Sequence, residues 1–168
     1  MVRLDRGGLH YYGILNDYRL EEQGPITVQL PAEAGRHLYD VRTHAHLGVR
    51  DSLELDLAPG ETALLAATPY EVDGISLVGV GRVAPGETCG FRLKVLPEAG
   101  MGDHVLRLTV TDPSGQVARH YCENLLTVGG QADVEIPFAP NDLLGTWSVV
   151  ARDLISGASA ETEVEVGR

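Results

Sequence analysis

The sequence predicts an all-β fold, and three observations support that prediction. Apolar and polar residues alternate along most of the apolar runs, which is the period of a strand with one buried face. Clusters of proline, glycine, aspartate and serine separate the runs, mostly at intervals of 10 to 15 residues. Helical periodicity is hard to find anywhere in the chain. These features are typical of antiparallel β-sandwiches.

The chain divides into two predicted domains, residues 1–70 and 71–168. The boundary is placed in the segment 68–74, where a proline would interrupt any sheet ladder. The first domain has room for a small β-sandwich of about five strands, and such a small core needs support from a neighbour. The second has room for an immunoglobulin-like sandwich of about seven strands. The fold class is therefore two consecutive antiparallel β-sandwiches, the second immunoglobulin-like.

Each element is predicted from its own pattern. In the first domain, strand character is found at residues 39–42, 53–57 and 63–67. In the second, it is found at residues 75–80, 89–93, 105–111, 134–138, 145–151 and 161–166. The sequence Ala-Pro-Gly-Glu-Thr occurs twice, at 58–62 and 84–88. Because proline presets φ at the second turn position and glycine accepts the positive φ that follows, both copies are predicted to form the same turn.

Trp147 is predicted to lie in the core between the sheets. The period of two places Trp147, Val149 and Ala151 on one face of their strand, with Ser148 on the other. An indole this large is seldom left unpaired on a surface. The residues expected to face it are Leu106, Leu108, Val110 and Ile136. Val150 interrupts the alternation, so the second face of this strand is expected to be partly covered.

Composition excludes several classes of function. The chain has 168 residues, 43% hydrophobic and 22% charged, close to an average soluble globular protein. Its net charge of −11 should repel nucleic acid and anionic lipid, so neither nucleic acid nor membrane is expected as a partner. The first residues, MVRLDRGG, lack the apolar region of a signal peptide. The compartment stays open, since a longer protein could be secreted or cytoplasmic.

The histidines around residue 44 offer the arrangement most like a metal site. His44 and His46 stand two positions apart, with His37 and Asp40 near in sequence. Imidazoles suit zinc or copper, but no third and fourth ligand follow at usable spacing. We therefore predict solvated histidines in the turn 43–46, no metal ligand and no cofactor.

Carboxylates, hydroxyls and thiols give no catalytic pattern. Glu161, Glu163 and Glu165 form a row on one strand face, which is typical of a charged sheet edge. The pair 141–142 is better explained by an Asx-type turn than by calcium, which needs six to eight oxygens. No serine stands in a nucleophile elbow. Cys89 and Cys122 are predicted to be small buried residues, and whether they form a disulfide is left open. The chain is therefore predicted not to be an enzyme.

Exposed aromatic rings would indicate a carbohydrate-binding surface. Tyr11 and Tyr12 are adjacent, so in a strand they point to opposite faces and one of them can be exposed. Together with Tyr18 they are the candidate sugar-stacking residues of the sequence.

Two stretches are more specific than composition. The first reads HLYDVRT at 37–43, then LG at 47–48, then LELDLAPGETALLAATPY at 53–70. It resembles the C-terminal β-sandwich of large bacterial glycoside-hydrolase-like proteins of the β-galactosidase type. The second contains DPSG at 112–115, IPFA at 136–139 and GTWSVVARD at 145–153. It resembles the immunoglobulin-like domain that follows in such proteins, and also macroglobulin-type domains of bacterial surface proteins.

The resemblance implies an accessory region rather than a catalyst. Nothing in the sequence matches a catalytic barrel, and the thioester motif of macroglobulins is absent because Cys89-Gly90 continues into Phe91. The implied role is packing or positioning of the catalytic domain of the same longer protein, which is then the expected partner. The alternatives are a carbohydrate-binding module and a surface adhesion or protein-interaction sandwich.

Overall fold

The computed structural model describes the chain except for residues 18, 20–25, 31–34 and 98–101. The described part is all-β: its regular elements are strands and one 3₁₀ turn, η1 (Arg119–Tyr121). No helix in this part is long and apolar enough to cross a bilayer. The chain forms two compact units, Met1–Glu71 and Val72–Arg168, whereas the sequence analysis placed the division after residue 70.

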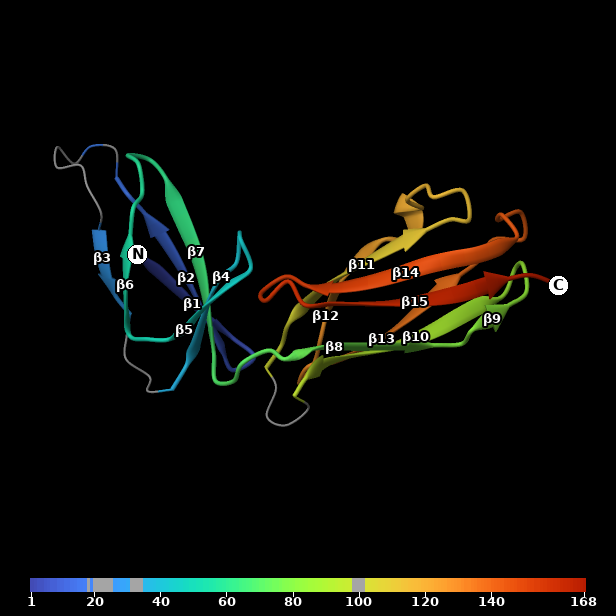
Figure 1. The fold of residues 1–168 in the computed structure, drawn as a ribbon, viewed down its shortest axis with the longest axis horizontal. Helices are drawn as coiled ribbons and strands as arrows, with labels where there is room; N and C mark the ends of the chain where they lie inside the picture. The colour runs from blue at the N-terminus through green and yellow to red at the C-terminus, as the bar shows by residue number, and fades with distance from the viewer. Residues whose placement is uncertain (18, 20–25, 31–34, 98–101) are drawn as a thin grey trace. The chain divides into compact units, whose positions relative to one another are not determined.

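Unit 1 contains a five-stranded antiparallel sheet and a separate strand pair (Figure 1). The sheet has the order β1 (Val2–Arg6), β2 (Leu9–Leu15), β7 (Thr62–Thr68), β4 (His37–Asp40) and β5 (Ala45–Val49). The pair consists of β3 (Ile26–Gln29) and β6 (Ser52–Leu55). The described residues thus hold seven strands here, two more than the sequence suggested.

The core of unit 1 lies between these two layers. Alternate residues of the large sheet point into it, among them Tyr12, Ile14 and Leu65. Val28 and Leu53 of the strand pair pack against this cluster from the other side. Unit 1 is therefore a small sandwich of unequal layers, as expected from a domain with few apolar residues to bury.

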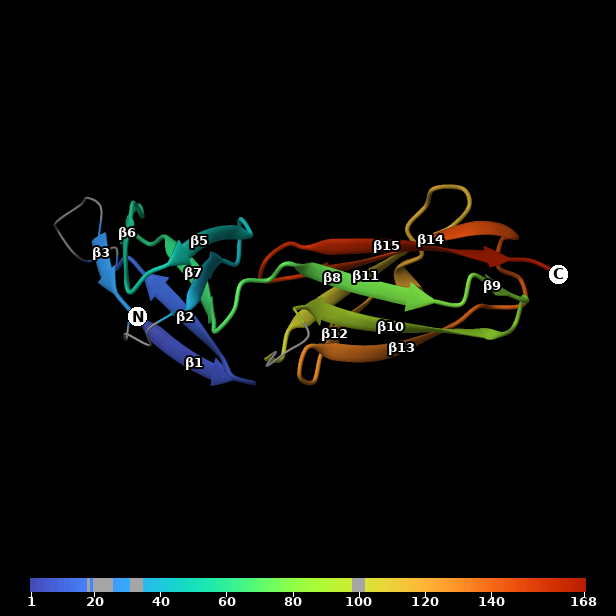
Figure 2. The same ribbon diagram turned by 60° about the horizontal axis from the view of Figure 1, so that its bottom comes forward.

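Unit 2 contains a three-stranded and a five-stranded sheet, which form two layers in Figures 1 and 2. The first has the order β13 (Gln131–Pro137), β10 (Thr88–Leu96) and β8 (Gly74–Gly79). The second has the order β12 (Glu123–Leu126), β11 (Val105–Thr111), β14 (Gly145–Asp153), β15 (Ser159–Val166) and β9 (Arg82–Val83). Most strands that follow each other in sequence lie in different layers, and only β11–β12 and β14–β15 pair within one sheet; this crossing between layers is an immunoglobulin-like arrangement. One pair, β9 with β15, is parallel.

The predicted alternation holds in unit 2. Leu106, Leu108 and Val110 of β11 are fully buried, whereas Arg107 between them is exposed. Trp147 is 2% exposed, and its neighbour Val150 is half-buried, as the interrupted alternation predicted. The period of two thus selected buried residues of this core, but Leu106, Leu108 and Val110 lie beside Trp147 in the same sheet, because β11 pairs with β14. Of the four residues expected to face Trp147, Ile136 of β13 is the one that belongs to the other sheet.

Both Ala-Pro-Gly-Glu-Thr copies fold into the same turn, as predicted. Gly60 and Gly86 adopt φ of 81° and 89°. In each copy, the backbone N–H of the glutamate donates to the carbonyl of the alanine three residues earlier, at 2.9 and 3.0 Å. The carboxylates of Glu61 and Glu87 accept the N–H of the same alanines, at 2.7 and 3.2 Å. The glutamate therefore closes the turn through both its backbone and its side chain.

Candidate functional site

The tyrosines proposed for sugar stacking take different positions. Tyr12 points into the core of unit 1 and is 2% exposed, so its ring offers no surface to a ligand. Tyr11, on the opposite face of β2, is half-buried. Tyr18 lies outside the described residues. The expectation that Tyr11 and Tyr12 point to opposite faces is correct, and Tyr12 is corrected from a candidate ligand residue to a core residue.

A different group of side chains meets where β4 and β5 pair. His37 of β4 and His46 of β5 come together with Glu71, which follows β7 near the end of unit 1. One possible ligand atom from each of the three lies within 4.8 Å of the others. His44 is separate from this cluster: it sits in the tight turn with φ of 61°.

A β-bulge brings the two imidazoles onto the same face. Leu38 pairs with Gly48, but Tyr39 pairs with His46, so Leu47 is an extra residue in β5. In a regular ladder without the bulge, Leu47 would pair with Tyr39, and His46 would then point to the core face. The bulge instead lets Leu47 pack against the core of unit 1 while His46 joins His37. The turn itself occupies residues 41–44, so the sequence analysis placed it about two residues late.

The distances within this cluster are short. His37 Nδ1 lies 3.1 Å from His46 Nε2 and 3.9 Å from a carboxylate oxygen of Glu71. The other Glu71 oxygen lies 3.3 Å from His46 Nδ1. The imidazoles are stacked at 18°, and the ring of Tyr39 stacks on His46 with centroids 4.8 Å apart. All three ionisable side chains are partly exposed, at 22%, 30% and 56% for His37, His46 and Glu71.

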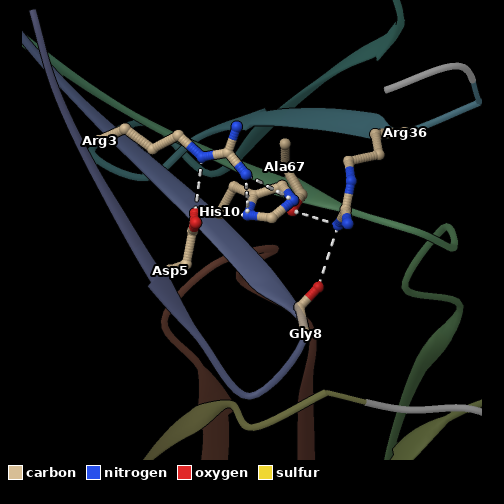
Figure 3. A network of polar contacts seen from close by, with 6 residues as sticks. All are labelled: Arg3, Asp5, Gly8, His10, Arg36 and Ala67. Carbon is tan, nitrogen blue, oxygen red and sulfur yellow. Dashed lines mark hydrogen bonds and ion pairs between the residues drawn. The ribbon is translucent and has the colours of Figure 1, made fainter. Parts of the chain in front are cut away.

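A second polar network joins β1 and β2 of unit 1 (Figure 3). Asp5 Oδ1 lies 2.6 Å from His10 Nδ1 and accepts Arg3 Nε–H at 2.7 Å. These hydrogen bonds, first that of Arg3, hold the pKa of Asp5 below its ordinary value despite some desolvation. Arg36 donates to the carbonyl of Gly8 at 3.0 Å. The network ties the end of the β1–β2 hairpin to the rest of unit 1.

A third polar pair is sealed inside unit 2. His104 Nδ1 lies 2.8 Å from Asp153 Oδ1, and both side chains have no solvent exposure. The other oxygen of Asp153 accepts the N–H and the hydroxyl of Ser156, at 2.8 and 2.6 Å. Burial raises the pKa of Asp153, but the hydrogen bonds from His104 and Ser156 and the charge of His104 outweigh it and leave the pKa below its ordinary value. A substrate cannot reach this pair, so its role is to fasten the β14–β15 turn to β11.

The remaining candidates have structural roles. Asp142 accepts the Ala139 N–H at 2.7 Å and the Tyr121 hydroxyl at 2.6 Å, which explains this acidic residue as part of a turn. Burial, followed by this hydrogen bond, raises the pKa of Tyr121. The cysteines are free: Cys89 is buried, which raises its pKa, and Cys122 is partly exposed.

One face of unit 1 carries a shallow apolar hollow, which the sequence analysis did not localise. Val2, Gly13 and Leu64 form one row across β1, β2 and β7, on the face opposite the core. Val2 is 73% and Leu15 57% exposed. Because Gly13 has no side chain, the sheet is hollowed at the middle of this row. The lining residues are Met1, Val2, Gly13, Ile14, Leu15, Asp17, Arg42, Thr62, Ala63 and Leu64.

The fold defines a tandem β-sandwich chain. No protein-family model matches it, and no curated protein matches its sequence. Distant structural neighbours include a mutant α-2-macroglobulin of Salmonella, with 13% identity, a TM-score of 0.41 and coverage of 94% of this chain but 16% of that chain. They also include the isomalto-dextranase of Arthrobacter globiformis T6 in complex with panose, with 14% identity, a TM-score of 0.32 and coverage of 95% and 31%. The chain thus spans a minor part of either neighbour.

Proposed function

We propose that this chain is a non-catalytic accessory region of two β-sandwich modules, part of a larger bacterial glycoside-hydrolase-like protein in which it packs against or positions another domain. The observation that supports this proposal is the apolar hollow of unit 1. Its centre is a glycine flanked by large exposed aliphatic side chains, and one acidic and one basic residue, Asp17 and Arg42, stand among its lining. An apolar centre with polar residues around it is the usual composition of a protein interface.

The occupant we propose is a folded domain of the same polypeptide. Unit 1 is a small sandwich whose second layer has two strands, so its core is limited and it gains from a covered face. A single exposed aliphatic residue needs no explanation, but a contiguous group around a hollow marks an interaction surface.

Two of the polar clusters favour a non-catalytic role. The His104–Asp153 pair has no solvent exposure, and Asp5 is held by Arg3 and His10. General acid–base catalysis needs a group within hydrogen-bond reach of a substrate proton. The Asp153 carboxylate has no solvent exposure and is out of this reach, whereas the exposed Asp5 carboxylate is held by its hydrogen bonds to Arg3 and His10.

Site-directed photo-cross-linking tests the packing role. A p-benzoylphenylalanine is placed at Leu64, in the hollow, and in a separate variant at Val117 of unit 2, which is 53% exposed. The protein is expressed as its complete gene encodes it and irradiated in the producing cell. We expect an intramolecular cross-link from position 64 to another domain, located by mass spectrometry, and none of comparable yield from position 117. Equal yields at both positions, or a cross-link from position 64 only to a separate protein, would contradict the proposal.

Two assays address the alternatives. The isolated chain is expected to leave chromogenic galactosides and glucosides unhydrolysed beyond the buffer rate, and reproducible hydrolysis that survives purification would overturn the non-catalytic role. Carbohydrate binding rests on Tyr11, whose ring is half-buried. A glycan array is expected to give no binding, and binding that is lost in Tyr11→Ala would favour a carbohydrate-binding module instead.

A further inference from the structure

We propose that His37, His46 and Glu71 form a binding site for a divalent transition-metal ion, with Zn²⁺ as the ion that suits the donors best. Two imidazoles and one carboxylate are a common zinc donor set, and they leave a fourth position for water. The ion would bridge β4, β5 and the segment after β7. This inference does not depend on the accessory role proposed above.

The distances fit such a site. Ligand atoms about 2.0 to 2.1 Å from a tetrahedral zinc stand about 3.3 Å from one another. His37 Nδ1 and His46 Nε2 are 3.1 Å apart, and a carboxylate oxygen of Glu71 lies 3.9 Å from the same His37 nitrogen. One ligand atom from each of the three residues lies within 4.8 Å of the others, so side-chain rotations are enough to bring the donors to ligand separations.

A small side-chain adjustment remains. A metal lies in the plane of each imidazole that binds it, whereas the two rings are stacked at 18°. One ring must rotate about its Cβ–Cγ bond. The ring of His46 is held by its stack on Tyr39, so the rotation falls to His37, which is partly exposed. Glu71, at 56% exposure, has the freedom to follow.

Charge also favours a cation here. Glu71 is the carboxylate that contacts both imidazoles, and the chain as a whole carries a net charge of −11. Because imidazole, carboxylate and water are borderline to hard ligands, zinc is preferred over copper(I), which needs thiolate or thioether donors. Calcium is excluded by the two nitrogen ligands.

Matched substitutions of three histidines test the site. His37→Asn and His46→Asn remove proposed ligands, and Glu71→Gln removes the carboxylate charge. The control is His44→Asn in the same hairpin, because asparagine tolerates the positive φ of 61° at that position. Binding of Zn²⁺ to the full chain is measured by competition with a chromogenic chelator, and each apo variant is checked by circular dichroism.

We expect one equivalent of Zn²⁺ to bind the wild-type chain and His44→Asn with the same affinity. Each of His37→Asn and His46→Asn should lose at least tenfold in affinity, and Glu71→Gln should lose affinity as well. Long-range ¹H–¹⁵N spectra should show zinc-dependent shifts of the ring nitrogens of His37 and His46 alone among the six histidines. The proposal is overturned if 100 μM Zn²⁺ leaves these resonances unmoved, or if His44→Asn weakens binding as much as His46→Asn. Should one histidine variant fail to fold, Glu71→Gln and the wild-type spectra decide.

Discussion

Replacing Trp147 by alanine tests the central packing argument for unit 2. The side chain is 2% exposed and packs edge-on against Phe138, with ring centroids 5.2 Å apart, and against Tyr121 at 6.0 Å. Its Nε1–H donates to the carbonyl of Leu143 at 2.9 Å. The substitution therefore removes buried area, two aromatic contacts and one hydrogen bond at once.

The expected cost is about 3–5 kcal/mol in the free energy of unfolding of unit 2, the range for deletion of a buried aromatic side chain. The aromatic contacts contribute about 0.5–1.5 kcal/mol each and the hydrogen bond about 1 kcal/mol, so a value toward the upper end is expected. The cavity cannot close easily, because Val149 and its neighbours in β14 are held by β11 and β15 on both sides. Most of the stability of an ordinary domain would be lost.

Guanidinium unfolding measured by circular dichroism gives the change, and hydrogen exchange of β11 assigns it to unit 2. Trp147→Phe is the control: it keeps an aromatic ring and should lose less than half as much. In the wild-type chain, the sole tryptophan should resist acrylamide quenching. A loss below about 1 kcal/mol on Trp147→Ala, together with ready quenching of the wild-type emission, would refute the core placement.

Three further predictions concern the same two units. The pKa of Asp153 lies below its unfolded value, so the Asp153 carboxylate stabilises unit 2 above about pH 4, and this contribution is lost as the pH falls through the folded-state pKa. The variant Asp153→Asn should therefore flatten the acid limb when the free energy of unfolding is measured over a series of pH values. A Cβ at Gly79 would lie 2.3 Å from Phe91, so Gly79→Ala should cost about 1–3 kcal/mol, whereas Gly90→Ala, with open space in the same sheet, should cost nothing in the same melts. Gly86→Ala should cost more stability than Gly60→Ala. Both glycines have positive φ, which costs an alanine about 1–2 kcal/mol, but only at Gly86 would the added Cβ meet Pro140, at 3.3 Å. Equal costs, measured by hydrogen exchange of the two turns, would contradict this prediction.

The all-β class, the strand positions of unit 2 and the repeated turn could be predicted from sequence because each depends on local signals. Alternation selects the buried face of β11 without knowledge of its partners. The Ala-Pro-Gly-Glu turn depends on φ preferences of its own residues. Even the position of Trp147 follows from the period of two and the size of its ring.

The His37, His46 and Glu71 cluster could not be predicted in the same way. Glu71 lies far along the chain and reaches the histidines only because β7 pairs with β4. His46 reaches the face of His37 only through the bulge at Leu47, and a single inserted residue has no signature in a plain alternation. His44 lies in the turn and His46 in β5, so their spacing in the sequence does not place them on a shared strand face. To predict this cluster, one would have needed the register in which residues 37–40 pair with residues 45–49, including its shift between Leu38 and Tyr39.

The parallel pairing of β9 and β15 has a mechanical consequence. The backbone N–H of Glu165 donates to Gly81 at 3.0 Å, and that of Gly167 donates to Val83 at 3.1 Å. Because the two strands run in the same direction, a pull on the N-terminal end of β9 and on the C-terminal end of β15 draws the strands in opposite directions along their axes. The two bonds then bear the load together instead of opening one after the other. Tension applied at the two ends of unit 2 would therefore meet this short parallel pair in addition to β8, which β10 holds ahead of it in the chain.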